Sequence, residues 1–294
     1  MFNATDFWYD GIYSGHYGLR IATIDGSVVE NTSYINPTRT LTKSAKGIKF
    51  RYGGSVYEQA PTTSFSVLSQ TPINDLFLRE ILCWLDNRKG FRPLQIIQAG
   101  LENYVYNCIF DVADIIYHAG CCVGLTLTAT FDSPYTYKAT VKSDKDGRLT
   151  YEEAYKEYEV ESADGAPTEL YIDISSEPNG ADTDAVDDYV YPMLNVEPSG
   201  YFSVDGTSEK HVIKIVNETD DANRAFVIKE LSTLTNLVVD NELKMIKPKD
   251  GTVRVLESFE GKKWLRLVKG TNKLKVQVKG VAKILVPQRA KIRF

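Results

Sequence analysis

Three carboxylates near the middle of this 294-residue sequence have a spacing that could bind a metal ion. Asp144, Asp146 and Glu153 lie around Gly147, in the order that ligands and glycine take in the second half of an EF-hand calcium loop. The first ligand position of such a loop is Lys142, however, and the residues before it look extended instead of forming an entering helix. An Asp-Gly turn explains the same residues without a metal. The three carboxylates are therefore metal candidates, and a simple turn is the competing interpretation.

No arrangement of side chains indicates catalysis. His16, His118 and His211 each stand without a neighbouring acid or nucleophile, so a catalytic triad would need one of them brought to a distant partner. Neither a G-x-S-x-G elbow nor a glycine-rich phosphate loop occurs. Paired carboxylates could support glycoside hydrolysis. Carboxylates are common in the predicted loops, however, so their presence does not indicate a glycosidase. We predict no catalytic residues and no cofactor, and we expect the chain not to be an enzyme.

Four cysteines, Cys83, Cys108, Cys121 and Cys122, are too few and too clustered for a disulfide framework. No paired C-x-x-C motif for zinc occurs. We predict buried, reduced thiols in a protein synthesised in a cytoplasm. The N-terminus has neither the basic nor the apolar region of a signal peptide, and the apolar runs are too short to span a bilayer. We therefore expect no membrane insertion.

Charge is unevenly distributed along the chain. The formal net charge of −5 argues against nucleic acid as the main partner. Residues 142–188 are strongly acidic, whereas residues 262–294 are basic. One interpretation is two solvated surfaces, and the other is that acidic and basic surfaces meet between copies of the protein.

Length and hydrophobic periodicity predict two β-rich domains. With 43% hydrophobic and 25% charged residues, the composition is that of a globular protein. In residues 1–137, strand-like alternation surrounds one helix, which Thr71 would cap and Pro72 would begin, with Gly90 beyond its end. The helix is predicted from one apolar stripe at three- and four-residue spacing, made of Ile73, Leu76, Phe77, Ile81, Leu82 and Leu85. Residues 138–168 read as a charged connecting arm or insertion, with a short helix near residues 152–158. Residues 169–294 contain short strands, with glycines about ten residues apart near the end, which predicts an antiparallel sandwich or jelly roll.

The order and spacing of several short motifs resemble a known family, the distal tail proteins of long-tailed, siphovirus-type bacteriophages of Gram-positive hosts. The similarity covers most of the chain apart from residues 138–168. Its motifs are Phe7-Trp8-Tyr9-Asp10-Gly11-Ile12-Tyr13-Ser14, Tyr17-Gly18-Leu19, Ile81-Leu82-Cys83-Trp84-Leu85, Tyr106-Asn107-Cys108-Ile109, Gly124-Leu125-Thr126-Leu127-Thr128, Phe131-Asp132-Ser133-Pro134-Tyr135, Asn179-Gly180, Tyr191-Pro192, Leu237-Val238-Val239-Asp240 and Trp264-Leu265-Arg266-Leu267-Val268-Lys269-Gly270-Thr271-Asn272.

The resemblance implies a mainly β structural protein. Residues 1–137 would be a ring-forming β-sandwich with one helix, and residues 169–294 a galectin-like antiparallel β-sandwich. The ring, a hexamer, would join the tail tube protein to the tail-tip protein, with receptor-binding or baseplate proteins around it and a channel for DNA. It would sit at the distal end of the virion tail, after synthesis in the host cytoplasm, and no sequence-specific nucleic-acid binding is implied.

The galectin resemblance leaves a second function open, a carbohydrate-binding module that helps attachment to the host cell wall. Sugar-binding galectins stack the sugar on a tryptophan that is followed by glycine and an acid. Here Trp264 is followed by Leu265, and Asn36-Pro37-Thr38-Arg39, the nearest likeness to the family's second sugar motif, lies in the other domain with an extra residue. We expect Trp264 to anchor a core, with sugar stacking as the alternative.

Overall fold

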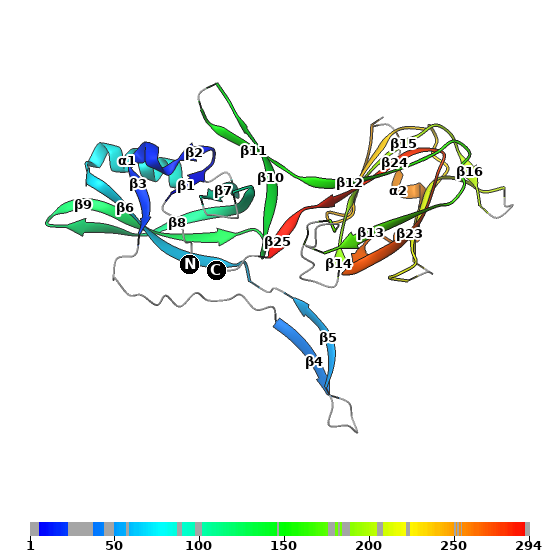
Figure 1. Ribbon diagram of the computed structural model, residues 1–294, viewed down its shortest axis with the longest axis horizontal. Helices are drawn as coiled ribbons and strands as arrows, with labels where there is room; N and C mark the ends of the chain where they lie inside the picture. The colour runs from blue at the N-terminus through cyan, green and yellow to red at the C-terminus, as the bar shows by residue number, and fades with distance from the viewer. Residues whose placement is uncertain are drawn as a thin grey trace. The chain divides into compact units, whose positions relative to one another are not determined.

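The structure is a computed structural model, and its chain divides into two compact units. It describes residues 6–22, 38–43, 50–56, 59–86, 90–97, 102–145, 147–175, 180–181, 183, 189–204, 208–221, 224–249, 251, 253 and 255–291. The first unit comprises Met1–Glu153 with Ala290–Phe294, and the second comprises Ala154–Arg289. Both are built mainly from antiparallel strands (Figure 1), which confirms the predicted fold class.

The first unit is organised around a ten-stranded sheet. Its main path runs β2-β1-β7-β8-β9-β6-β3, and β10, which also pairs with β11 and β25, joins it at β8. Strands β4 and β5 pair with each other in a separate two-stranded sheet. The elements are β1 (Phe7–Tyr9), β2 (Ile12–Tyr13), the 3-10 helix η1 (Ser14–Tyr17), β3 (Leu19–Ala22), β4 (Thr38–Lys43), β5 (Phe50–Val56), β6 (Thr62–Ile73), α1 (Asp75–Leu85), β7 (Arg92–Ile96), β8 (Tyr104–His118), β9 (Cys121–Phe131), β10 (Tyr135–Ser143), β11 (Leu149–Glu153) and β25 (Arg289–Lys291).

Helix α1 is the one predicted from its apolar stripe, but it begins later than expected. Thr71 and Pro72 belong to the end of β6, and Asn74 caps the helix by accepting a hydrogen bond from the Phe77 N–H at 2.9 Å. Strand β6 continues through an irregular register before the helix, and such irregularities are where a strand tolerates proline. The buried side of the helix consists of Ile81, Trp84 and Leu85.

Aromatic rings fix α1 to the sheet. Trp84 stacks on Phe7 and on Tyr17, with ring centroids 6.0 Å and 4.8 Å apart. Its indole N–H also donates to the Tyr9 carbonyl at 3.0 Å. Because the indole packs against two rings and also donates a hydrogen bond, it fixes the orientation of the helix on this core.

The second unit is a β-sandwich. One sheet has the order β12-β24-β15-β19-β20, and the other has the order β13-β23-β17-β18-β21 with β16 beside β17. Side chains from both sheets, such as Leu194 and Ile284 from the first and Ile215 and Val276 from the second, share one buried core. The elements are β12 (Tyr155–Ser162), β13 (Thr168–Ile174), β14 (Tyr189–Val190), β15 (Met193–Pro198), β16 (Phe202–Ser203), β17 (Lys210–Asn217), β18 (Ala225–Lys229), β19 (Leu237–Asp240), β20 (Met245–Pro248), α2 (Val255–Ser258), β21 (Phe259–Glu260), β22 (Leu267–Val268), β23 (Gly270–Val278) and β24 (Gly280–Pro287).

Residues 138–168, expected as a charged arm, are mostly strand. Strand β10 ends and β11 lies within this range, followed by β12, and the boundary between the units falls between Glu153 and Ala154. The short helix predicted near residues 152–158 is wrong, because β11 and β12 occupy that segment. Alternating exposed glutamates on β12 explain why the segment reads as polar while still forming a sheet edge.

Candidate interaction surfaces

The candidate metal residues that the structure describes lie in the β10–β11 hairpin, at its turn and at the end of β11. Asp144 Oδ1 accepts a hydrogen bond from the Arg148 N–H at 2.8 Å, so this carboxylate stabilises the turn. Glu153 lies at the far end of β11, opposite Ala139, about 13 Å along the strand from the turn. Asp146 lies outside the described residues. Asp144 and Glu153 are therefore not brought together, and the turn interpretation fits the described residues better than a metal loop.

The same turn contacts the start of the first unit through Arg148. Its guanidinium donates from Nε and Nη2 to the Asp10 carbonyl, both at 3.0 Å, and from Nη2 to Asp10 Oδ2 at 3.0 Å. Next to this contact, the Leu149 N–H donates to the Gly11 carbonyl at 3.0 Å. A side chain at Gly11, whose φ is +78°, would place its Cβ 2.3 Å from the Leu149 oxygen. This position therefore requires glycine.

The acidic and basic stretches of the sequence meet within the chain. Lys283 on β24 lies 2.8 Å from Glu157 and 3.0 Å from Glu159, both on the neighbouring strand β12. Lys273 on β23 lies 2.7 Å from Glu169 on β13. Hydrogen bonds to the two glutamates raise the pKa of Lys283. Pairing between copies is therefore not needed to explain the charge asymmetry.

The three histidines lie on different elements of the structure. His16 contacts the Tyr17 ring, His118 lies exposed at the end of β8, and His211 is buried against Phe202 in the second unit. Among the residues that the structure describes, no three His, Cys, Asp or Glu side chains are grouped as a metal site. In the same residues, no helix is long and apolar enough to cross a membrane.

The cysteines are free thiols, but only two are buried. Cys108 and Cys122 lie in the core of the first unit, and burial raises the pKa of Cys108. Cys83 on α1 and Cys121 at the start of β9 are exposed, so the prediction of four buried thiols is wrong for these two. Cys121 and Cys122 are neighbours on a strand, and neighbouring strand residues point to opposite faces.

Trp264 packs against the core of the second unit. Its ring meets the Phe259 ring edge to face, with centroids 4.8 Å apart, and it is only partly buried. The Trp264 carbonyl accepts a hydrogen bond from Arg224 Nη2 at 3.1 Å. These contacts support the core-anchor interpretation over sugar stacking.

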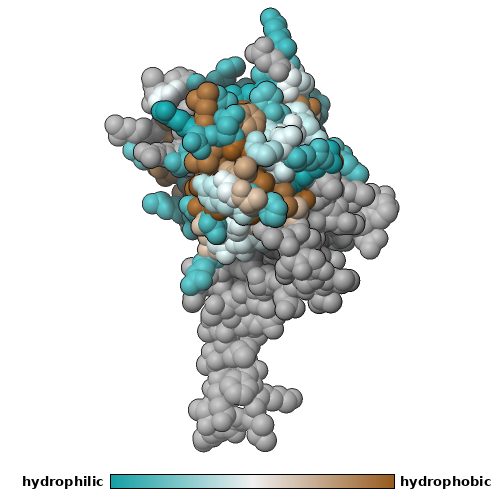
Figure 2. All heavy atoms as spheres, turned by 90° about the vertical axis from the view of Figure 1, so that its left-hand side faces the viewer, coloured by the Kyte–Doolittle hydropathy of each residue, from teal (hydrophilic) through white to brown (hydrophobic). Residues whose placement is uncertain are grey.

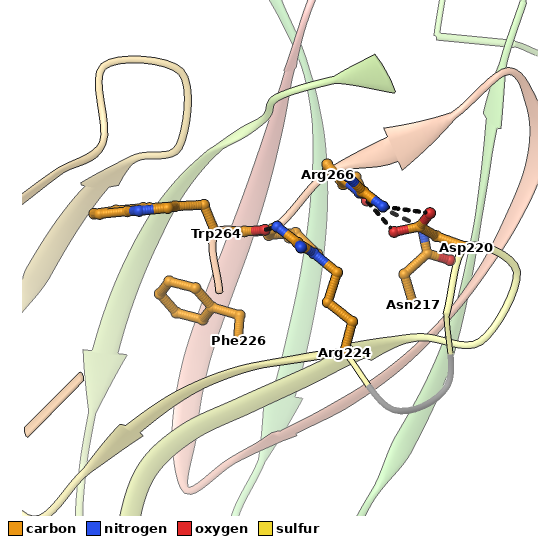
Figure 3. Close-up of a pocket in the computed structure, with 7 residues that line it drawn as sticks. Asn217, Asp220, Arg224, Phe226, Trp264 and Arg266 are labelled. Atoms are coloured by element: carbon orange, nitrogen blue, oxygen red, sulfur yellow. Dashed lines mark hydrogen bonds and ion pairs between the residues drawn. The ribbon is translucent and has the colours of Figure 1, made fainter. Parts of the chain in front are cut away.

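A small polar pocket lies next to Trp264 (Figure 3). Arg266 donates to Asp220 through Nε at 2.7 Å and Nη2 at 3.0 Å, and its guanidinium stacks on the Tyr189 ring at 3.7 Å. The hydrogen bond to Asp220 raises the pKa of Arg266. Asn217 donates both to the Arg266 carbonyl and to Asn272. The pocket encloses space for about one water molecule, which is too small for a sugar ring.

Exposed apolar side chains mark a further surface of the first unit. Figure 2 shows apolar side chains gathered on the end of this unit that faces left in Figure 1, with polar ones around them. The unit's exposed large apolar residues include Leu76 on α1 and Tyr117 on β8, at 70% and 62% exposure. Contiguous apolar surface of this kind marks protein contacts.

The first unit is similar to a known protein domain. Residues 2–133 match the family model described as the phage tail protein N-terminal domain. No curated protein matches the sequence.

The whole chain is also similar in structure to solved phage proteins. One is the Dit protein of phage SPP1, described as a paradigm of the hub adsorption apparatus in Gram-positive infecting phages, with a TM-score of 0.61 and 12% identity over 98% of this chain and 100% of that one. Another is in the baseplate of phage P2 in its activated, calcium-containing conformation, with a TM-score of 0.43 and 9% identity over 99% of both chains, which is too low to establish a shared fold. The family match covers the first unit, and the likeness to SPP1 Dit shows a shared fold, both in agreement with the resemblance found in the sequence.

Proposed function

We propose that this chain is the hub of a phage tail tip, a ring that joins the tail tube to the proteins that reach the host. The observation that carries the proposal is that both units together follow the fold of SPP1 Dit over the full length of each chain. The family match of the first unit to a tail protein domain supports the same location in the virion.

The surfaces of the first unit suit this role. A closed ring requires each subunit to use two different faces, one for each neighbour. Exposed large apolar side chains occur on α1 and β8, and also at both ends of β7, where Phe91 is 46% and Ile97 45% exposed. The unit therefore has apolar groups at more than one place from which a heterologous contact can be built.

The proposed assembly has six copies in its ring, with the tail tube protein on one side and the tail-tip protein on the other. Receptor-binding or baseplate proteins would be held around it through the second unit. The chain itself would perform no catalysis, because a hub acts through its protein contacts.

Co-purification with the neighbouring tail proteins tests this function. The full chain should be captured by the tail tube protein and by the tail-tip protein of the same phage, each expressed with a tag. A matched capsid protein of that phage serves as the negative bait. Capture by neither tail protein, with the chain folded, would contradict the hub.

A further inference from the structure

Apolar side chains cross the outer face of the five-stranded sheet of the second unit. Leu285 on β24 lies opposite Met193 on β15. Asp240 on β19 lies between Met193 on one side and Met245 of β20 on the other. Val238, two residues from Asp240 along β19, is therefore the diagonal neighbour of both methionines. We call Met193, Val238, Met245 and Leu285 the outer apolar row.

The outer apolar row points away from the core of the sandwich. Leu194, Val239 and Ile284 alternate with its members along the same strands, and all three are buried in the core. The members themselves are exposed or half-exposed. Leu243, in the turn between β19 and β20, is 67% exposed and lies next to the row in the sequence. Apolar surface gathered in this way marks a protein contact.

The methionines of this chain are concentrated in the outer apolar row. Apart from Met1, the sequence has only Met193 and Met245, and both belong to the row. Neither is part of the buried core, so packing within the sandwich does not explain them. Methionine is unbranched and polarizable, and it is used at surfaces that adapt to a bound partner.

Both edges of the same sheet are protected against an added strand. The edge strand β12 exposes Glu157, Glu159 and Glu161, and charges of one sign along an edge discourage pairing. The other edge strand, β20, ends at Pro248, which has no N–H to donate to a new strand. A partner of this sheet would therefore lie on its outer face, not along its edges.

Two lysines beside the outer apolar row have no carboxylate partner among the described residues. Lys247 lies opposite Val238, and Lys249 follows on the same side of the strand, where its N–H donates to the Asn236 carbonyl at 2.8 Å. Lys283, in the same sheet, differs from them because Glu157 and Glu159 hold it at 2.8 Å and 3.0 Å.

The carboxylates closest to the row in the structure are already engaged within the chain. Asp240 Oδ1 accepts a hydrogen bond from the Leu243 N–H at 2.8 Å. Glu242 accepts two from Arg289, at 3.0 Å and 2.8 Å. The uncompensated charge beside the row is therefore positive, and a partner that covers the row would be complementary if it brought carboxylates to Lys247 and Lys249.

We propose that the outer apolar row is the docking site of an acidic amphipathic helix from another protein of the same virion. The row spans four neighbouring strands, about 14 Å, which is the length of about ten helical residues. Apolar side chains on one side of a helix recur every turn, so a helix lying across the strands can place one on each. The inference rests on the proposed function for the source of the helix, whereas the surface itself needs no ring.

Hydroxyl-radical footprinting of the purified full chain and of whole virions tests whether the row is covered. Mass spectrometry measures the oxidation of Met193 and Met245, with Tyr171, which is exposed on the other sheet, as the reference for general shielding. Both methionines should be oxidised about tenfold less in the virion than in the purified chain, because oxidation follows exposure. Protection of the methionines no greater than that of Tyr171 would overturn the docking site.

Carbodiimide cross-linking of the same virions tests the chemistry of the partner, because the reagent joins a lysine only to a carboxylate in contact with it. Lys247 or Lys249 should link to Asp or Glu of another protein, in a stretch whose apolar residues recur at three- and four-residue spacing. The link between Lys273 and Glu169, which lie 2.7 Å apart, is the positive control in both samples. Links only to another copy of this chain, to a stretch without that spacing, or to nothing while the control link forms, would contradict the proposal.

Charge reversal separates docking from folding. Lys247→Glu/Lys249→Glu should reduce the amount of the cross-linked protein in virions about tenfold, because it repels the partner's carboxylates. Lys269→Glu/Lys275→Glu, at exposed positions in and beside β23 of the other sheet, is the matched control and should retain that protein. Both variants should keep the unfolding midpoint of the wild type. Full retention of the partner by the folded Lys247→Glu/Lys249→Glu chain would contradict the docking site.

The same samples separate a failure of the docking site from a failure of the proposed function. A chain that is absent from the tail of the virion would refute the proposed function. A chain that is present in the tail, with Met193 and Met245 as freely oxidised as in the purified protein, would refute the docking site alone.

Discussion

Arg148 and Asp10 join the tip of the β10–β11 hairpin to the turn between β1 and β2. Two guanidinium nitrogens of Arg148 donate to the Asp10 carbonyl at 3.0 Å, and Nη2 also reaches Asp10 Oδ2 at 3.0 Å. Asp10 itself has a positive φ of 48°, an uncommon conformation for a residue other than glycine. The contact makes the hairpin a fixed part of the first unit.

We expect Arg148→Ala to release the hairpin tip. The substitution removes three hydrogen bonds around a half-exposed charge, so the free energy of unfolding of the first unit should fall by about 1 kcal/mol. The Leu149 amide, which donates to Gly11, should exchange its hydrogen faster. Lys145→Ala, at an exposed position in the same turn, is the control, and equal exchange rates in the two variants would contradict the anchoring role.

Ile81 is one of the fully buried side chains of α1. Ile81→Ala should therefore lower the free energy of unfolding of the first unit by about 2–5 kcal/mol. Leu76→Ala, on the exposed side of the same helix, should change it by less than about 0.5 kcal/mol. Denaturant unfolding monitored by tryptophan fluorescence compares the two, and similar losses would mean that Leu76 is covered in the assembly.

The sequence predicted the type and order of these elements better than their ends. The apolar stripe predicted α1, and alternation predicted most of the strands, because both periodicities are local properties. Thr71 and Pro72 also form a good helix start locally, but the register irregularity of β6 keeps them in the strand and leaves Asn74 as the cap. The register between β6 and β9 depends on residues far apart in the sequence, so it leaves no local signal.

The candidate surfaces, too, could be predicted only in part from the sequence. The apolar run Leu237-Val238-Val239 predicts a strand, but that Val238 faces outward near Met193 depends on pairing between distant strands. The acidic and basic stretches were visible, yet the pairing of Glu157 with Lys283 joins residues 126 positions apart. Of the metal candidates, Asp144 and Glu153 lie apart because the strand that Glu153 ends runs away from the turn.

The oligomer should keep its size across a wide range of salt. The lysine–glutamate pairs of the second unit lie within one chain, so screening them should not separate subunits. Light scattering from about 0.01 M to about 1 M salt, over which the Debye length falls from about 30 Å to about 3 Å, should give one mass. Lys283→Ala should leave that mass unchanged too. Dissociation at high salt would show that charge pairs hold the copies together.

Alkaline pH should destabilise the first unit through its buried phenols. Burial raises the pKa of Tyr106 from 10.0 to about 12, so the folded state favours the neutral form. Its stabilising contribution is complete below pH 10 and is lost as the pH rises toward 12, because the unfolded chain releases the proton first. Burial also raises the pKa of Tyr9 and of Cys108, which add to the same trend.

Tyr106→Phe should therefore lose less stability than the wild type between pH 8 and pH 11, by about 1 kcal/mol. Urea midpoints measured at both pH values give this difference directly, independently of any loss common to both. Tyr117→Phe, which removes a hydroxyl from an exposed side chain, should follow the wild type. An identical pH dependence in all three proteins would contradict the role of Tyr106.

Electron microscopy of the purified full-length chain tests the central claim most directly. The account predicts closed rings with six-fold symmetry and a central passage, with a mass about six times that of the 33.0 kDa subunit. Single 33.0 kDa particles at high protein concentration, or open filaments without closure, would contradict it.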